Sequence, residues 1–184
     1  HANNETGVIQ PIPEIARVAH VHGAFVHTDA AQSLGKIPVH VDALGVDLLS
    51  VAGHKLYAPK GVGALYVRAG TPLAPLLRGG GQERGVRPGT ENVASLVGLG
   101  AASEIAARTG LAESQRIKRL RDLLWDGLRA HVPGIALNGH VVERLPNTLN
   151  LRFPRALGSA VLAAAHEIAA STGSACHEGG EAPS

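Results

Sequence analysis

Lys55 occupies a setting that could give a lysine amine covalent chemistry. It ends the run Gly53-His54-Lys55, which directly follows the apolar segment 46–52. The end of a buried strand places the amine near an apolar environment, and desolvation favours the neutral amine that can form a Schiff base. A solvated lysine at a strand end is the alternative interpretation, and the local sequence alone favours it.

Asp29 holds a similar position after another apolar segment, 24–27, and small residues follow it. A carboxylate here could keep the ring nitrogen of pyridoxal phosphate (PLP) protonated, which makes that cofactor an electron sink. An Asp that starts a turn or caps a helix is the simpler interpretation, and it stays open at this stage.

Cys176 is the only cysteine, and it lies in the run Gly173-Ser174-Ala175-Cys176-His177. Small neighbours predict an accessible thiol, whereas a structural cysteine usually lies among larger apolar side chains. With one cysteine an intramolecular disulfide is excluded, and a free thiol fits a reducing, cytoplasmic setting. A reactive and a structural role are both compatible with this pattern.

Two other patterns carry less information. The Gly-rich polar segment 78–91 could hold a phosphate group with backbone N–H groups, but it has neither P-loop nor Gly-x-Gly-x-x-Gly spacing and equally fits an exposed loop. His20 and His22 do not share a helical face, and neither HExxH nor CxxC occurs. We therefore expect no metal site.

The elements that must position these residues follow an α/β order. We predict a helix over 13–22, strands over 24–27, 46–52 and 62–67, helices over 92–108 and 113–131, strands over 135–137 and 148–153, a helix over 159–166 and an edge segment over 168–171. In a sheet covered on both faces, ligand groups gather beyond the carboxyl ends of strands. The change of character near 109–110 predicts two domains, 1–109 and 110–184.

Composition narrows the function classes further. Hydrophobic residues make up 45% and charged residues 17% of the 184 residues, which is typical of a packed protein and not of a disordered one. The net charge of +2 comes without a basic stripe, so we expect no direct nucleic-acid partner. No apolar run is long enough to span a membrane, so we expect no membrane partner.

The chain contains no methionine and begins with His1. We therefore expect an internal segment of a longer protein. A complete, processed protein is the alternative.

Five segments together resemble cysteine desulfurases of the NifS/IscS type. They read HANNETG at 1–7, VHTDAAQSLGK at 26–36, GHKLYAPKG at 53–61, GGGQERGVRPGT at 79–90 and SAC at 174–176, and the resemblance extends over essentially the whole chain. It implies the α/β fold of the fold-type I PLP-dependent transferases. The first domain would be the C-terminal half of the large mixed-sheet α/β domain, and the second a part of the small C-terminal α+β domain.

The resemblance also implies roles for residues around PLP. Lys55 would bind the cofactor covalently and move protons, and Asp29 would pair with the ring nitrogen. Gln32 and Asn4 would contact a ring oxygen or the substrate, and His54 would help to hold the phosphate.

Two implied roles reach beyond a single site. Thr90 would contact the phosphate bound by the partner subunit of a homodimer. Cys176, as a thiolate, would take sulfur from L-cysteine, leaving L-alanine and a persulfide. A sulfur-acceptor protein, such as an iron–sulfur scaffold, would receive that sulfur for cluster, thio-cofactor or tRNA synthesis.

The chain departs from the family pattern in three ways. Ala52 stands where the family often has a serine that binds phosphate. The family's N-terminal phosphate turn with its stacked histidine, and its arginine for the substrate carboxylate, have no counterpart here. We therefore expect this chain by itself to be inactive. The alternatives are a selenocysteine lyase or another class V enzyme, and a non-catalytic fragment that binds sulfur-acceptor proteins.

Overall fold

The computed structural model describes residues 1–174. The chain divides into two compact units. The first unit comprises His1 and Pro11–Leu111, and the second comprises Ala2–Gln10 and the chain from Ala112 onward.

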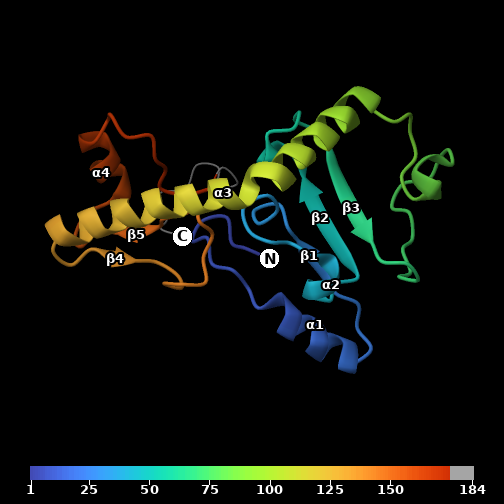
Figure 1. Cartoon of the computed structure of the whole chain (residues 1–184), viewed down its shortest axis with the longest axis horizontal. Helices are drawn as coiled ribbons and strands as arrows, with labels where there is room; N and C mark the ends of the chain where they lie inside the picture. The colour runs from blue at the N-terminus through green and yellow to red at the C-terminus, as the bar shows by residue number, and fades with distance from the viewer. Residues whose placement is uncertain (175–184) are drawn as a thin grey trace. The chain divides into compact units, whose positions relative to one another are not determined.

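The first unit is built on a mixed three-stranded sheet in the order β1-β2-β3 (Figure 1). β1 pairs in parallel with β2, and β2 pairs antiparallel with β3. Its elements are α1 (Ile12–Val21), β1 (His27–Asp29), α2 (Val41–Leu44), β2 (Leu48–Ala52), the 3-10 helix η1 (Gly53–Leu56), β3 (Gly63–Val67), the 3-10 helix η2 (Gln82–Gly85) and the start of α3 (Val93–His131).

The core of this unit lies between α1 and the sheet. Ile12 and Ala16, one turn apart on α1, are both buried, as expected for the inward stripe of an amphipathic helix. They belong to one hydrophobic cluster with Val26, Ala30, Leu44, Val46 and Leu49. The cluster anchors β1 and β2, the two strands that carry the candidate site at their ends.

Asp47, just before β2, is a buried carboxylate with two hydrogen bonds. Its Oδ2 atom lies 2.8 Å from His20 Nε2 and accepts the Val26 N–H, also at 2.8 Å. Together these bonds hold the pKa of the Asp47 carboxyl below its usual range, the His20 bond contributing most. The carboxylate thus ties α1 to the segments that lead into β1 and β2.

Replacing Asp47 with Asn should lower the free energy of unfolding by about 1–3 kcal/mol, because a buried donor loses a charged acceptor. Since the folded pKa of Asp47 is depressed, its stabilisation is present above about pH 4 and is lost as the pH falls through the folded value. Urea unfolding at pH 7 and pH 3 measures both effects.

Asp126→Asn, at an exposed ion pair, is the control. Equal losses in the two variants would contradict the assignment.

The second unit contains a small antiparallel pair of strands, β4 (Ala136–Leu137) and β5 (Leu151–Arg152), the helix α4 (Gly158–Ala164) and the later part of α3. Val8 forms a β-bridge with Arg144, which ties segment 2–10 into this unit. Arg144 is buried, and its pKa is lowered by burial and then by the positive charge of Arg121. Arg121 in turn donates to the Leu145 carbonyl at 2.8 Å, so two arginines organise the segment before β5.

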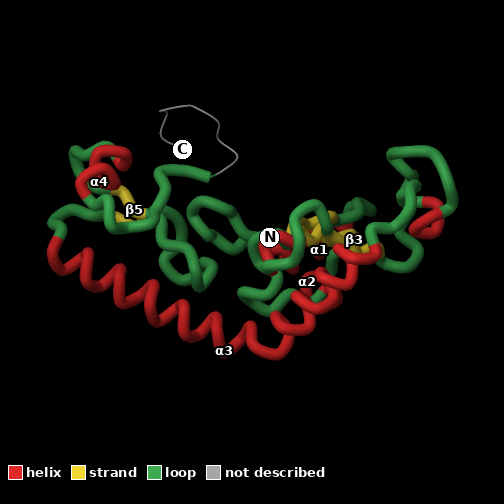
Figure 2. The backbone as a smooth tube through the Cα atoms, turned by 90° about the horizontal axis from the view of Figure 1, so that it is seen from above, coloured by secondary structure: helices red, strands yellow, loops and turns green. Residues whose placement is uncertain are grey.

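The structure corrects three of the predicted elements. The predicted helices 92–108 and 113–131 form one helix, α3, which Figure 2 shows as uninterrupted. Gly110 costs a helix only about 1 kcal/mol relative to Ala, and Thr109 Oγ1 bonds back to the Ile105 carbonyl at 2.9 Å. The predicted edge segment 168–171 is not part of a sheet, since those residues form no strand. Residues 24–26 precede β1 rather than belonging to it.

Within residues 1–174, no helix has both the length and the apolar character needed to cross a lipid bilayer.

Candidate functional site

Asp29 and Lys55 lie beyond the same edge of the sheet. Asp29 is the last residue of β1 and is paired in register with Ser50 of β2. β2 ends at Ala52, and η1, which carries His54 and Lys55, follows at once. Because β1 and β2 are parallel, their carboxyl ends meet at one edge, where α/β sheets bind ligands.

Backbone hydrogen bonds brace the turn that carries Lys55. Gly53 N–H donates to the Val62 carbonyl at 3.0 Å, and Ala58 N–H donates to the Gly53 carbonyl at 3.1 Å. Leu56 is buried, whereas Lys55 and His54 are exposed. Tyr57 closes the turn in the left-handed region, with φ of 65°. A non-glycine residue held there indicates a turn fixed by its surroundings.

Gly53→Ala should destabilise the protein by about 1–3 kcal/mol and displace Lys55, because the added Cβ would lie 2.6 Å from the Val62 carbonyl oxygen. Thermal unfolding and cofactor binding measure the two effects. Gly100→Ala is the matched control, since its Cβ would enter open space on helix α3. A Gly53→Ala variant with unchanged melting temperature and binding would show that the close approach is not required.

The turn after β1 is also well defined. Asp29 Oδ1 accepts the Ala31 N–H at 2.7 Å, as in an Asx turn. Ser33 is fully buried and its Oγ lies 2.9 Å from His1 Nδ1. Gln32, which lies between Ala31 and Ser33, is half-buried. These contacts fix Asp29 and Gln32 on one short, rigid segment.

The side chains at this edge fit PLP by their chemistry. The cofactor offers an aldehyde to an amine, a basic ring nitrogen to a carboxylate, and acceptor oxygens to amide and imidazole donors. Lys55, Asp29, Gln32 and His54 supply these groups. In the part of the chain that the structure describes, no carboxylate lies within ion-pair distance of the Lys55 amine.

Two other predicted residues are exposed on loops. Asn4 belongs to the second unit, where its neighbour Asn3 accepts the N–H groups of Glu5 and Thr6 at 2.9 and 2.8 Å. The side-chain oxygen of Asn3 is thus bonded within the turn, and Asn4 is exposed.

Thr90 ends the Gly-rich loop of the first unit and is exposed. Gln82 Oε1 accepts the N–H of the preceding Gly89 at 3.2 Å, so the loop is held by one of its own side chains. Cys176 lies outside the described residues.

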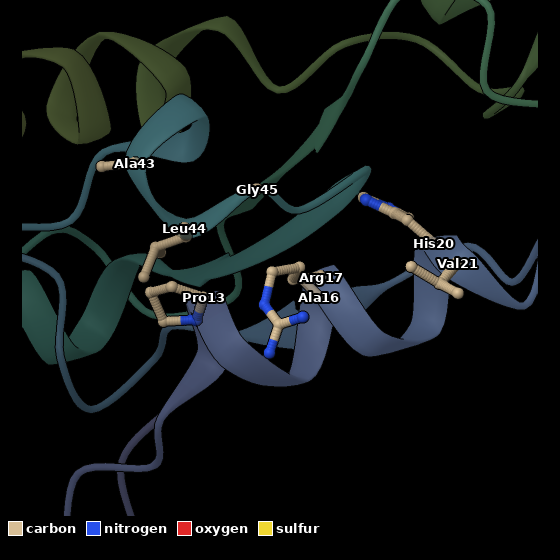
Figure 3. Close-up of a pocket in the computed structure, with 8 residues that line it drawn as sticks. All are labelled: Pro13, Ala16, Arg17, His20, Val21, Ala43, Leu44 and Gly45. Carbon is tan, nitrogen blue, oxygen red and sulfur yellow. The ribbon is translucent and has the colours of Figure 1, made fainter.

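A separate apolar groove lies between α1 and α2 (Figure 3). It is lined by Pro13, Ala16, Arg17, His20, Val21, Ala43, Leu44 and Gly45, and none of the predicted site residues is among them. No group of three or more His, Cys, Asp or Glu side chains arranged to hold a metal ion occurs in residues 1–174.

Sequence reasoning overlooked one residue that contacts the candidate site. Lys36 Nζ donates to the Gln32 carbonyl at 2.8 Å and lies 3.5 Å from Gln32 Oε1. The four-residue spacing of Gln32 and Lys36 could have indicated this contact. Residues four apart are neighbours, however, only where the segment forms a helical turn.

Comparison with known proteins places the chain in a family. A family model described as Aminotransferase class-V matches residues 1–182. The cysteine desulfurase IscS of Ehrlichia chaffeensis is 48% identical over 99% of this chain and 45% of its own length. The cysteine desulfurase NifS of Azotobacter vinelandii is 50% identical over the whole chain and 46% of its own length. The chain thus spans about half the length of the curated relatives it matches.

Solved structures agree on the fold. A NifS-like protein from Rickettsia africae superposes with a TM-score of 0.86 at 36% identity, over 94% of this chain and 48% of that one. The expected fold-type I PLP-dependent transferase architecture is therefore confirmed, including the mixed sheet. By sequence and by structure, the chain belongs to the aminotransferase class-V family.

Proposed function

We propose that the protein is a PLP-dependent cysteine desulfurase, which converts L-cysteine into L-alanine and an enzyme-bound persulfide. The observation that carries the proposal is the location of Asp29 at the end of β1 and of Lys55 in the turn directly after β2, at the carboxyl ends of two neighbouring parallel strands. Relatives 48% and 50% identical over nearly all of this chain, which are named cysteine desulfurases, support the same reaction.

The residues at the sheet edge have distinct parts in this proposal. When bound, PLP supplies an electron sink for bonds broken at the substrate α-carbon. Lys55 anchors the cofactor through its amine and moves protons at the substrate. Asp29 keeps the ring nitrogen protonated through its carboxylate. Its Oδ1 atom already accepts the Ala31 N–H, which holds the carboxylate in place. His54 donates to the cofactor phosphate from the exposed side of η1.

Residues from elsewhere would complete the site. Asn4 and Gln32 contact a ring oxygen of the cofactor or the substrate, and Thr90 contacts the phosphate bound in the partner subunit of a homodimer. Cys176 would attack the substrate sulfur as a thiolate, so that an S–S bond forms while the Cβ–S bond of the substrate breaks. The electron pair left on Cβ takes up a proton to give the methyl group of alanine, and the sulfur stays on Cys176 as a persulfide.

Organisation and partners follow from the same proposal. Residues 1–109 form part of the large cofactor-binding domain and 110–184 part of the small domain. The persulfide passes to an acceptor protein such as an iron–sulfur scaffold, in the cytoplasm. A ratio of cysteine to selenocysteine turnover above one separates this function from a selenocysteine lyase.

Borohydride reduction in the presence of PLP, followed by peptide mass mapping, tests the cofactor site directly. The expected product is a pyridoxyl adduct on Lys55 of the full-length protein. No adduct on Lys55 would overturn the proposal and favour a scaffold that binds acceptors without turnover. An adduct on Lys60 instead, a nearby exposed lysine, would overturn the assignment of the cofactor lysine.

A further inference from the structure

Lys36 contacts Gln32 at the candidate site and has none of the proposed cofactor-binding roles. It is half-buried, and its ammonium group folds back onto the segment that follows β1. Its Nζ atom donates to the Gln32 carbonyl at 2.8 Å and lies 3.5 Å from Gln32 Oε1. The Lys36 ammonium group therefore contacts both the backbone and the side-chain oxygen of Gln32.

The Lys36 contact fixes the orientation of the Gln32 amide. An ammonium group has donors and no acceptor, so the amide oxygen, and not the amide nitrogen, must face it. The Gln32 N–H2 group is then turned away from Lys36 and is available to donate.

Packing brings this arrangement next to the cofactor lysine. A Cβ at Gly35 would lie 2.6 Å from Leu56 Cδ2 and 3.3 Å from Ala106 Cβ, so the segment bearing Gln32 and Lys36 is pressed against η1. Consistent with this, burial lowers the pKa of Lys36, and the positive charge of Lys55 lowers it further. The two amines are therefore within electrostatic reach of each other.

We propose that Lys36 is a positioning residue. It holds the two oxygens of Gln32 so that the Gln32 N–H2 group is presented to an oxygen atom of the PLP ring. This inference rests on the proposed cofactor site. It adds a residue that does not touch the cofactor and acts through another side chain.

A double-mutant cycle on the full-length protein tests the proposal. The measurements are the dissociation constant of PLP and the absorbance maximum of the bound cofactor, for Lys36→Met, Gln32→Leu and the double variant. Lys36→Met should weaken PLP binding about 3–10-fold and shift the absorbance maximum, as expected for one lost hydrogen bond. In the Gln32→Leu background, Lys36→Met should have no further effect.

Two further variants exclude a merely structural role. Lys36→Arg keeps the donor character and should bind PLP within about 2-fold of wild type. Lys60→Met removes an exposed lysine of the same unit and should leave both measurements unchanged.

Two outcomes would overturn the inference. One is an equal loss of PLP affinity when Lys36→Met is made in the wild-type protein and in Gln32→Leu. The other is a Gln32→Leu single variant that binds PLP and absorbs like the wild type, and this outcome can be measured even if Lys36→Met does not fold. Failure of the wild-type protein to bind PLP would instead overturn the proposed function.

Discussion

Lys55→Ala in the full-length protein should reduce the formation of alanine from L-cysteine by about 10³-fold or more. The variant lacks both the amine that anchors the cofactor and the group that moves protons at the substrate. It should also lose the visible absorbance of covalently bound PLP. Alanine release and an absorbance spectrum measure the two effects on the same sample.

Lys60→Ala is the matched control, because Lys60 is exposed and lies five residues beyond the cofactor lysine. It should retain both turnover and absorbance. Normal turnover by Lys55→Ala would show that the reaction does not use this amine, and the proposed chemistry would have to be abandoned.

Cys176→Ser should separate cofactor binding from sulfur transfer. A serine hydroxyl is not ionised at neutral pH and cannot displace sulfur as a thiolate does. Persulfide formation should therefore disappear, and alanine release should fall on the order of 10³-fold, as it does when other enzymes lose a nucleophile. Binding of PLP at Lys55 should be unchanged.

Cys176 is the only cysteine within the 184 residues, so the peptide that carries it contains no second thiol from this sequence. Alkylation after incubation with L-cysteine, followed by mass mapping of the peptide, reports a persulfide at one position. Full desulfurase activity in Cys176→Ser would show that another group accepts the sulfur.

Sequence patterns were sufficient to find the sheet edge. Polar residues follow the apolar segments before Asp29 and Lys55, and the structure has strands that end at Asp29 and Ala52, although β1 begins only at His27. The parallel pairing of β1 and β2 follows from the intervening crossover through α2.

Other features depend on energies that local patterns do not reveal. Thr109-Gly110 resembled a helix end, but a single glycine costs a helix less than the packing of its flanking turns contributes. The contact of Lys36 with Gln32 depends on the backbone conformation of a short turn after β1. Tyr57 adopts a positive φ that its residue type disfavours, so nothing in the sequence marked the turn.

The uneven distribution of aromatic residues gives each unit its own optical signal. The single tryptophan, Trp125, lies on the part of α3 that belongs to the second unit, with Arg129 5.8 Å from its ring centre. Both tyrosines, Tyr57 and Tyr66, belong to the first unit. Tryptophan emission therefore follows melting of the second unit, and the absorbance of Tyr66, which packs against the core of the first unit, follows the first. A nitro group placed on the fully exposed Tyr57 would give a chromophore two residues from the cofactor lysine.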